Sequence, residues 1–173
     1  MERIPLLFDK MIKPEWFDFA LERFVSSDSE DALRTELRDW LKSEDLSQVS
    51  IDKTIRVLQK VVGFRSTLTK SELQELYNRL NQLTPDERAH ERLQMLIQNN
   101  AFFSDCVQCI RRRALNGATF ITVMEMYEAL QKQYGYRQSV TRRIRYVLQT
   151  LAAFGCLENR DRVWHFKDDS PLL

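Results

Sequence analysis

The sequence predicts a mainly α protein, with an N-terminal helical bundle over residues 1–100 and a region over 101–173 that mixes helices with a small β-hairpin. Two observations lead to this prediction. Only 4 Gly and 4 Pro occur in 173 residues, which favours long helices over a many-stranded fold. Apolar residues recur at helical spacing through the first hundred positions, whereas short β-branched and aromatic runs occur in the last third.

Composition narrows the class of protein. Hydrophobic residues make up 43% of the chain and charged residues 29%, a balance typical of a soluble globular protein and not of a disordered one. The 3 Cys show no disulfide pattern, which indicates a reducing compartment. Residues 1–16 carry charges within their apolar stretch, and no run is long enough to cross a membrane. We therefore expect a cytoplasmic protein without a signal peptide or a membrane partner.

Helix start and stop signals divide the first hundred residues into five helices. Lys13-Pro14-Glu15 begins the first helix, with proline at a position that helices tolerate. Ser29 precedes the second helix, Ser50 is predicted to cap the third, and Gly63 to end it. The stretches 69–72 and 84–87 have capping-box form and begin the fourth and fifth helices.

The last third has a different order of elements. The predicted elements are a helix over 101–116, a strand over 119–121, a helix over 123–133 capped by Thr122, a helix over 140–154 capped by Ser139, and a hairpin of 156–158 with 163–166 around the turn 159–162. Helix, strand, helix, helix, strand, strand is the order of a winged helix-turn-helix. The sequence therefore predicts a winged-helix-like region over 101–173.

Charge is distributed unevenly along the chain. Residues 1–105 hold 15 Lys+Arg and 19 Asp+Glu, a net of −4, whereas 106–173 hold 11 and 6, a net of +5. No acidic residue lies between Glu128 and Glu158, although this segment contains five basic ones. A positive face confined to one part of a chain is the electrostatic pattern expected for a polyanion ligand. A solvated face, or one paired with the acidic half, is the alternative.

The helix predicted over 140–154 would present a polar face opposite its apolar face. The residues on or beside that polar face, or at its start, are Arg137, Gln138, Ser139, Arg142, Arg143, Arg145, Tyr146 and Gln149. Arg pairs with guanine or phosphate and Gln with adenine, so Arg142, Arg145 and Gln149 are the predicted groove contacts. Arg137 and Arg143 are predicted phosphate contacts, and Ser139 with the helix start could hold a phosphate.

The turn of the predicted hairpin carries two further arginines. Arg160 and Arg162 flank Asp161 at the expected tip, where the wing of such a fold reaches the DNA backbone or an adjacent groove. We predict that both contact phosphate. Arg and Gln also occur on exposed helices because they favour helix formation, and winged helices also dock proteins, so protein binding stays open as the alternative.

Motifs that would indicate an enzyme are absent from the sequence. Cys106 and Cys109 form a C-x-x-C, but within a predicted helix and without a second pair of ligands for zinc. His90 and His165 have no neighbouring nucleophile motif. There is no P-loop, dinucleotide-binding glycine motif or H-E-x-x-H. We expect a non-catalytic protein with no metal and no cofactor.

Several stretches of the last third resemble a known family. They are Ala-Phe-Phe-Ser-Asp-Cys-Val at 101–107, Tyr-Gly-Tyr-Arg-Gln-Ser-Val-Thr-Arg-Arg at 134–143, Arg-Tyr-Val-Leu-Gln-Thr-Leu at 145–151, and Phe-Gly-Cys-Leu at 154–157. They resemble the BrxA family, small helical accessory proteins of bacteriophage exclusion (BREX) systems. Over the first hundred residues the likeness is one of layout only. The resemblance implies a mostly helical, non-enzymatic, DNA-binding component of a bacterial anti-phage defence cluster.

Taken together, the residues and the resemblance predict a non-catalytic protein that binds double-stranded DNA in an anti-phage defence system. The acidic N-terminal half would then face other defence-system proteins or a second copy of the chain. Two alternatives remain at this point. One is a protein–protein adaptor in a defence complex, and the other is a small winged-helix transcriptional regulator.

Overall fold

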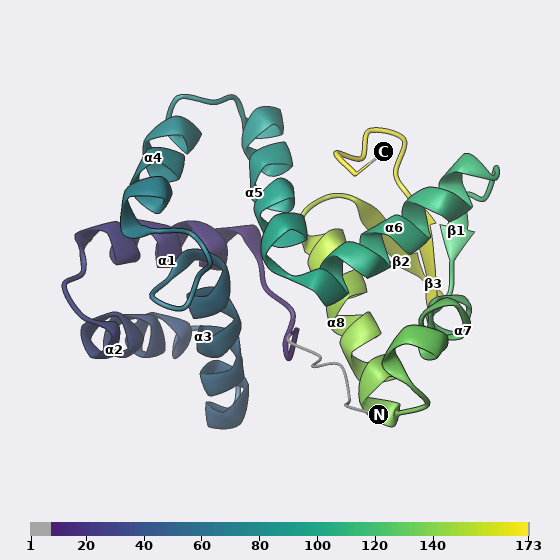
Figure 1. Cartoon of the computed structure of the whole chain (residues 1–173), viewed down its shortest axis with the longest axis horizontal. Coiled ribbons are helices and arrows are strands. Elements are labelled where there is room, and N and C mark those ends of the chain that lie inside the picture. Colours follow the sequence, from purple (N-terminus) through teal and green to yellow (C-terminus); the bar gives the residue numbers. More distant parts are fainter. Residues whose placement is uncertain (1–7, 173) are drawn as a thin grey trace.

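The computed structural model describes residues 8–172, and within this range the chain forms eight helices and one three-stranded antiparallel sheet (Figure 1). The elements are α1 Pro14–Ser26, α2 Glu30–Leu41, α3 Gln48–Val62, α4 Lys70–Leu80, α5 Pro85–Asn99, α6 Ala101–Leu115, β1 Phe120–Ile121, α7 Val123–Tyr134, α8 Gln138–Ala153, β2 Leu157–Arg160 and β3 Val163–Phe166. The prediction of a mainly helical chain with a small antiparallel sheet is confirmed.

Side-chain caps account for most helix starts. Ser29 accepts a hydrogen bond from the Ala32 N–H, and α2 begins directly after it, where the sequence predicts the second helix. Thr69, Thr84 and Thr122 each begin a complete capping box, in which the threonine and the glutamate three residues later satisfy each other's backbone N–H groups. These local signals are independent of packing, which explains why the sequence alone locates α4, α5 and α7.

Two predicted caps are wrong. The third helix is capped by Ser47, whose side chain accepts from the Ser50 N–H at 3.2 Å, so α3 begins three residues before the predicted start. The last helix begins at Gln138 after Arg137, which makes no side-chain cap, and Ser139 already lies in its first turn. In both cases the helix extends toward the N-terminus beyond the serine chosen from the sequence.

The sheet has the order β1-β3-β2 and joins segments distant in sequence. β1 pairs with β3 through Phe120 opposite His165, and β2 pairs with β3 from Leu157 opposite Phe166 to Arg160 opposite Val163. The hairpin turn is therefore only two residues, Asp161 and Arg162, shorter than the predicted turn over 159–162. Both have positive φ, 53° and 66°, as a tight type I′ hairpin requires.

The N-terminal helices and the α6–β3 region lie side by side, with α5 leading directly into α6 (Figure 1). Asn100 ends α5 and caps α6, accepting from the Phe103 N–H at 2.8 Å. The segment before α1 also joins the two parts. Phe8 is fully buried with its ring 5.2 Å from that of Phe103, and the Ile12 N–H donates to Thr150 Oγ1 of α8 at 3.1 Å.

The helices of residues 8–172 fall short of what a bilayer crossing requires, either in length or in apolar character.

Candidate nucleic-acid interface

One face of α8 is fixed in the core. Val140, Ile144, Val147, Leu148 and Leu151 are all fully buried, at the spacing that places them on one side of a helix. Full burial of five side chains on one stripe leaves little freedom for the helix to rotate about its axis. The direction of the opposite face is therefore set by packing.

That opposite face carries cations and amides in solvent. Gln138, Arg142, Arg145 and Gln149 are all exposed. Among the described residues, no carboxylate lies within ion-pair distance of Arg142 or Arg145. The first turns of α8 form an open depression of about 560 Å³, lined by Gln138, Ser139, Thr141, Arg142 and Arg145. We call this surface, with Gln149, the α8 face.

Thr141 was not among the residues predicted from the sequence. It lies in the first turn of α8, where it lines the depression next to Arg142 and Arg145. Its position on a helical wheel, about 100° from Val140, is the signal that could have found it. Hydroxyl groups at such a position commonly contact phosphate or a base edge.

Arg143 is placed differently from the prediction. Its side chain is only 17% exposed, and its Nη2 lies 2.5 Å from Asp9 Oδ1. Asp9, 18% exposed, also lies 3.5 Å from Arg56 Nη1 of α3. Asp9 thus joins α8 to the N-terminal helices through two guanidinium groups. We assign Arg143 to this internal ion-pair network and not to phosphate contact.

Two other predicted contacts are also drawn inward. Tyr146 is half-buried, and the Lys10 ammonium lies 5.4 Å from the centre of its ring. Arg137 is half-buried and donates from Nε to the Tyr134 carbonyl oxygen at 3.0 Å. The structure therefore separates these two side chains from the α8 face. Their inward orientation depends on the segment before α1 and on the α7–α8 turn, which a helical wheel of α8 does not represent.

The hairpin places both predicted arginines in solvent. Arg160 is exposed on β2, with Nε 3.9 Å from Glu158 Oε1, a distance at which an exposed pair is weak. Arg162 is exposed at the second turn position with φ of 66°. Glycine is the residue that favours this position in a type I′ turn, and a larger residue there is strained by about 1 kcal/mol or more.

The three cysteines lie in the interior of the described structure. Cys106, Cys109 and Cys156 are all free and buried. Burial raises the pKa of Cys106 and of Cys109, and it raises the pKa of Cys156 to about 11. Burial, and then the hydrogen bond that its hydroxyl donates to Asp105, raises the pKa of Tyr134. These groups are neutral at physiological pH, and their surroundings disfavour the thiolate that metal binding or nucleophilic catalysis needs.

Residues 8–172 contain no group of three or more His, Cys, Asp or Glu side chains placed to hold a metal ion. Comparison of the chain with protein-family models, with curated proteins and with solved structures finds no match.

Proposed function

We propose that residues 101–173 form a winged helix-turn-helix, and that the protein is a cytoplasmic, non-catalytic component that binds double-stranded DNA. The order of elements from α6 to β3 supports this proposal, with α8 as the recognition helix and the β2–β3 hairpin as the wing. The antiparallel order β1-β3-β2, in which the final strand lies in the middle, is consistent with it.

The observation that carries the proposal is the pair Arg142 and Arg145 on the α8 face. Each guanidinium is exposed and lacks a carboxylate partner among the described residues. Arginine is the side chain best suited to bidentate contact with phosphate or with guanine O6 and N7. Gln138 and Gln149 on the same face supply the amides that pair with adenine.

The tip of the proposed wing supports the same function. An exposed turn does not require a charged residue. Position 162 nevertheless has an arginine with positive φ, where a glycine would relieve the backbone strain. Strain at an exposed position is commonly associated with function. Contact between the Arg162 guanidinium and the DNA backbone would account for it.

The wider setting of the protein is part of the proposal. The resemblance to the BrxA family supports a role in a bacterial anti-phage defence assembly, together with other defence-system proteins. Gene neighbourhood tests this part directly, because a methyltransferase and a large ATPase encoded beside the chain would favour it. Their absence would leave DNA binding as a separate question.

Binding of labelled duplexes, measured by fluorescence anisotropy at about 50 and about 200 mM salt, tests DNA binding. If Arg142, Arg145, Arg160 and Arg162 each neutralise one phosphate, affinity should fall about 100-fold between the two concentrations. Absence of binding at the lower concentration would contradict the proposal. A footprint confined to one palindromic site would favour a transcriptional regulator, and binding spread over any sequence would favour an assembly component.

A protein–protein adaptor is the second candidate, and one observation favours it. Three large apolar side chains are exposed near the end of α6, on β1 and at the start of α7: Leu115, Phe120 and Met124, with Leu115 86% exposed. Because α6 packs against both β1 and α7, these side chains lie on neighbouring elements, and apolar groups exposed on neighbouring elements are common at protein interfaces. Loss of partner capture on Leu115→Ser and Met124→Ser, without loss of duplex binding, would assign this surface to a protein and α8 to DNA.

A further inference from the structure

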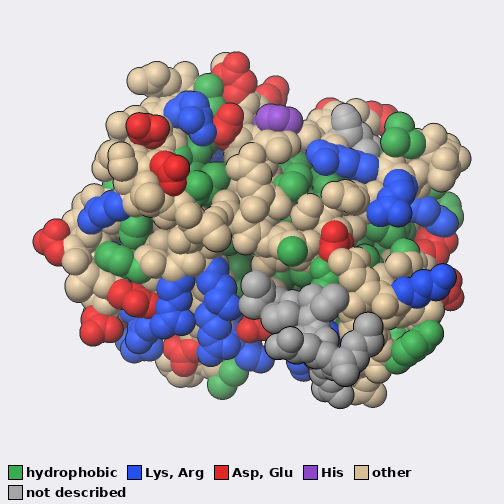
Figure 2. Space-filling view, in the orientation of Figure 1, with side chains coloured by type: hydrophobic (Ala, Val, Ile, Leu, Met, Phe, Trp, Pro, Cys, Tyr) green, Lys and Arg blue, Asp and Glu red, His purple; other side chains and the backbone are tan. Residues whose placement is uncertain are grey.

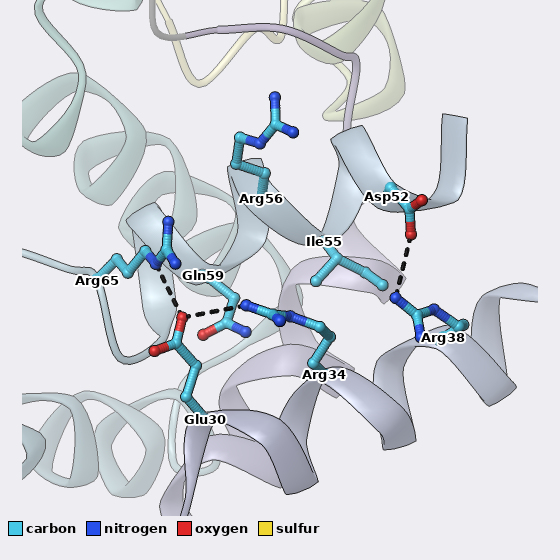
Figure 3. Close-up of a pocket in the computed structure, with 8 residues that line it drawn as sticks. All are labelled: Glu30, Arg34, Arg38, Asp52, Ile55, Arg56, Gln59 and Arg65. Atoms are coloured by element: carbon cyan, nitrogen blue, oxygen red, sulfur yellow. Dashed lines mark hydrogen bonds and ion pairs between the residues drawn. The ribbon is translucent and has the colours of Figure 1, made fainter. Parts of the chain in front are cut away.

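A second cationic surface lies on the N-terminal helices, far from the predicted interface in sequence. Figure 2 shows Lys and Arg side chains gathered over α2 and α3, at the lower left of the view. They border a pocket of about 350 Å³ between these helices (Figure 3), and its lining residues are Glu30, Arg34, Arg38, Asp52, Ile55, Arg56, Gln59 and Arg65. We call it the arginine pocket. The net charge of −4 over residues 1–105 conceals it.

Cations outnumber anions in the arginine pocket. Four guanidinium groups line it, against the two carboxylates of Glu30 and Asp52. Glu30 Oε1 lies 2.8 Å from Arg65 Nε and 3.5 Å from Arg34 Nη2, so one carboxylate is shared between two arginines. Arg56 extends away from both of these carboxylates in Figure 3, and its partner is Asp9, 3.5 Å from its Nη1. The lining as a whole has two more positive than negative charges.

The ion pairs of the pocket are partly exposed to solvent. Asp52 lies 3.3 Å from Arg38 Nη2, and its side chain is about half exposed, as are those of Arg56 and Arg65. Ion pairs this exposed contribute little, so a guanidinium can exchange a carboxylate for a stronger acceptor. Phosphate oxygens are such acceptors, because two parallel N–H groups of arginine fit them and the anion carries more charge.

The base of the pocket has an unsatisfied polar group. The Gln59 side chain is 2% exposed, and its Oε1 has no hydrogen-bond partner among the described residues. Figure 3 places its amide between Glu30 and the guanidinium of Arg34. Buried polar atoms without a partner are rare in folded proteins and call for a specific explanation. Rotation of this amide would direct its NH₂ group toward an anion held by the arginines.

From these observations we propose that the arginine pocket binds a phosphoryl group. Arg34, Arg38 and Arg65 would hold the oxyanion, and the Gln59 amide would complete its hydrogen bonding. The phosphoryl group comes either from a small phosphorylated molecule or from a nucleic-acid backbone, since both present the same oxygens. This inference does not depend on duplex binding by α8.

Calorimetric titration with pyrophosphate and with a nucleoside 5′-monophosphate tests the small-molecule source. The pocket variant is Arg34→Gln with Arg65→Gln. The matched control is Arg23→Gln with Arg79→Gln, which removes the same charge from half-exposed arginines that pair with Glu36 and Glu91 outside the pocket. We expect at least tenfold weaker binding in the pocket variant and a change of less than twofold in the control.

Duplex anisotropy on the same proteins tests the nucleic-acid source. A loss of duplex affinity in the pocket variant, but not in the control, would place a backbone phosphate in the pocket. Variants of Arg142 and Arg145 would leave binding of pyrophosphate unchanged, so failure of the α8 proposal and failure of this one give different results. Equal behaviour of pocket variant and control toward every probe, or no binding of any probe, would overturn the proposal.

A measurement on the unaltered protein tests the proposal even if the pocket variant fails to fold. Backbone amide chemical shifts of the full chain, followed by NMR during addition of pyrophosphate, should change mainly within residues 30–38 and 52–65. Shifts spread evenly over basic surfaces elsewhere would contradict a built pocket.

Discussion

The arginines of the N-terminal helices and those of α8 differ in their partners. In the first region most arginines are paired: Arg23, Arg34, Arg38, Arg65, Arg79 and Arg92 each lie within 4 Å of a carboxylate of the same region. The strongest pair is Arg92 with Asp18, with two hydrogen bonds of 2.7 and 2.6 Å between α5 and α1. On α8, Arg142 and Arg145 have no carboxylate partner among the described residues.

This difference shows that formal charge and available charge are separate quantities. An arginine buried with its carboxylate, such as Arg143, stabilises the fold, whereas an exposed arginine without a carboxylate can attract a polyanion at little cost in desolvation. The half-exposed pairs of the arginine pocket lie between these two cases. The contrast exists within α8 itself. Arg142 and Arg143 are neighbours in sequence, yet Arg142 is exposed to solvent whereas Arg143 is ion-paired with Asp9.

The largest change in stability is expected when the ion pair between Asp9 and Arg143 is removed. Asp9→Ala removes the carboxylate that pairs with Arg143 at a site only 17% exposed, so we expect a loss of about 2–3 kcal/mol in the free energy of unfolding. Asp31→Ala is the control, since the Asp31 side chain is 95% exposed and should change stability by less than about 0.5 kcal/mol. Urea denaturation measures both variants. Equal stability of the two would mean that Asp9 does not join α8 to the bundle.

A smaller effect of opposite sign is expected at the hairpin turn. Arg162→Gly relieves positive φ in a non-glycine residue, so thermal unfolding should show a gain of about 0.5–1 kcal/mol. Duplex affinity should fall at the same time, by about tenfold or less, because one phosphate contact is removed. Arg160→Gly, on a strand, serves as the control and should not stabilise. A gain in stability with unchanged affinity would remove Arg162 from the interface.

The smallest effect near neutral pH comes from the buried thiols. Their pKa values are raised in the folded protein, so above the unfolded value of about 9 the unfolded chain loses protons that the folded chain retains. Stability should therefore be full below pH 9 and should decline from there toward pH 11. Arginine stays charged throughout this range, so duplex binding by the folded protein should not follow the same curve. Stability that rises from pH 9 to 10 would contradict the burial of these thiols.

The helices could be located from the sequence because their signals are local. Capping boxes at Thr69, Thr84 and Thr122 depend on residues three positions apart, and the exposed stripe of α8 follows from its apolar periodicity. The β2–β3 hairpin was also accessible, because its apolar runs flank a polar turn. The length of that turn could be determined only from the register of the strand pairing, in which Arg160 lies opposite Val163.

The rest of the site depends on contacts between distant segments. Arg143 meets Asp9, which lies far from it in sequence, and Tyr146 packs near Lys10 from the same segment. A helical wheel places both residues near the exposed arc, but it carries no information on the segment before α1 that packs against them. The arginine pocket was missed for the same reason, since α2 and α3 bring together cations that an overall negative charge conceals.

Duplex anisotropy of the double variant Arg142→Glu with Arg145→Glu tests the central claim most directly. The control, Lys42→Glu with Arg23→Glu, changes net charge equally at exposed sites on the N-terminal helices. We predict that the α8 variant loses about 100-fold or more in affinity with its circular dichroism unchanged, while the control loses about threefold or less. Equal affinity of the two variants would show that the exposed arginines of α8 do not hold DNA.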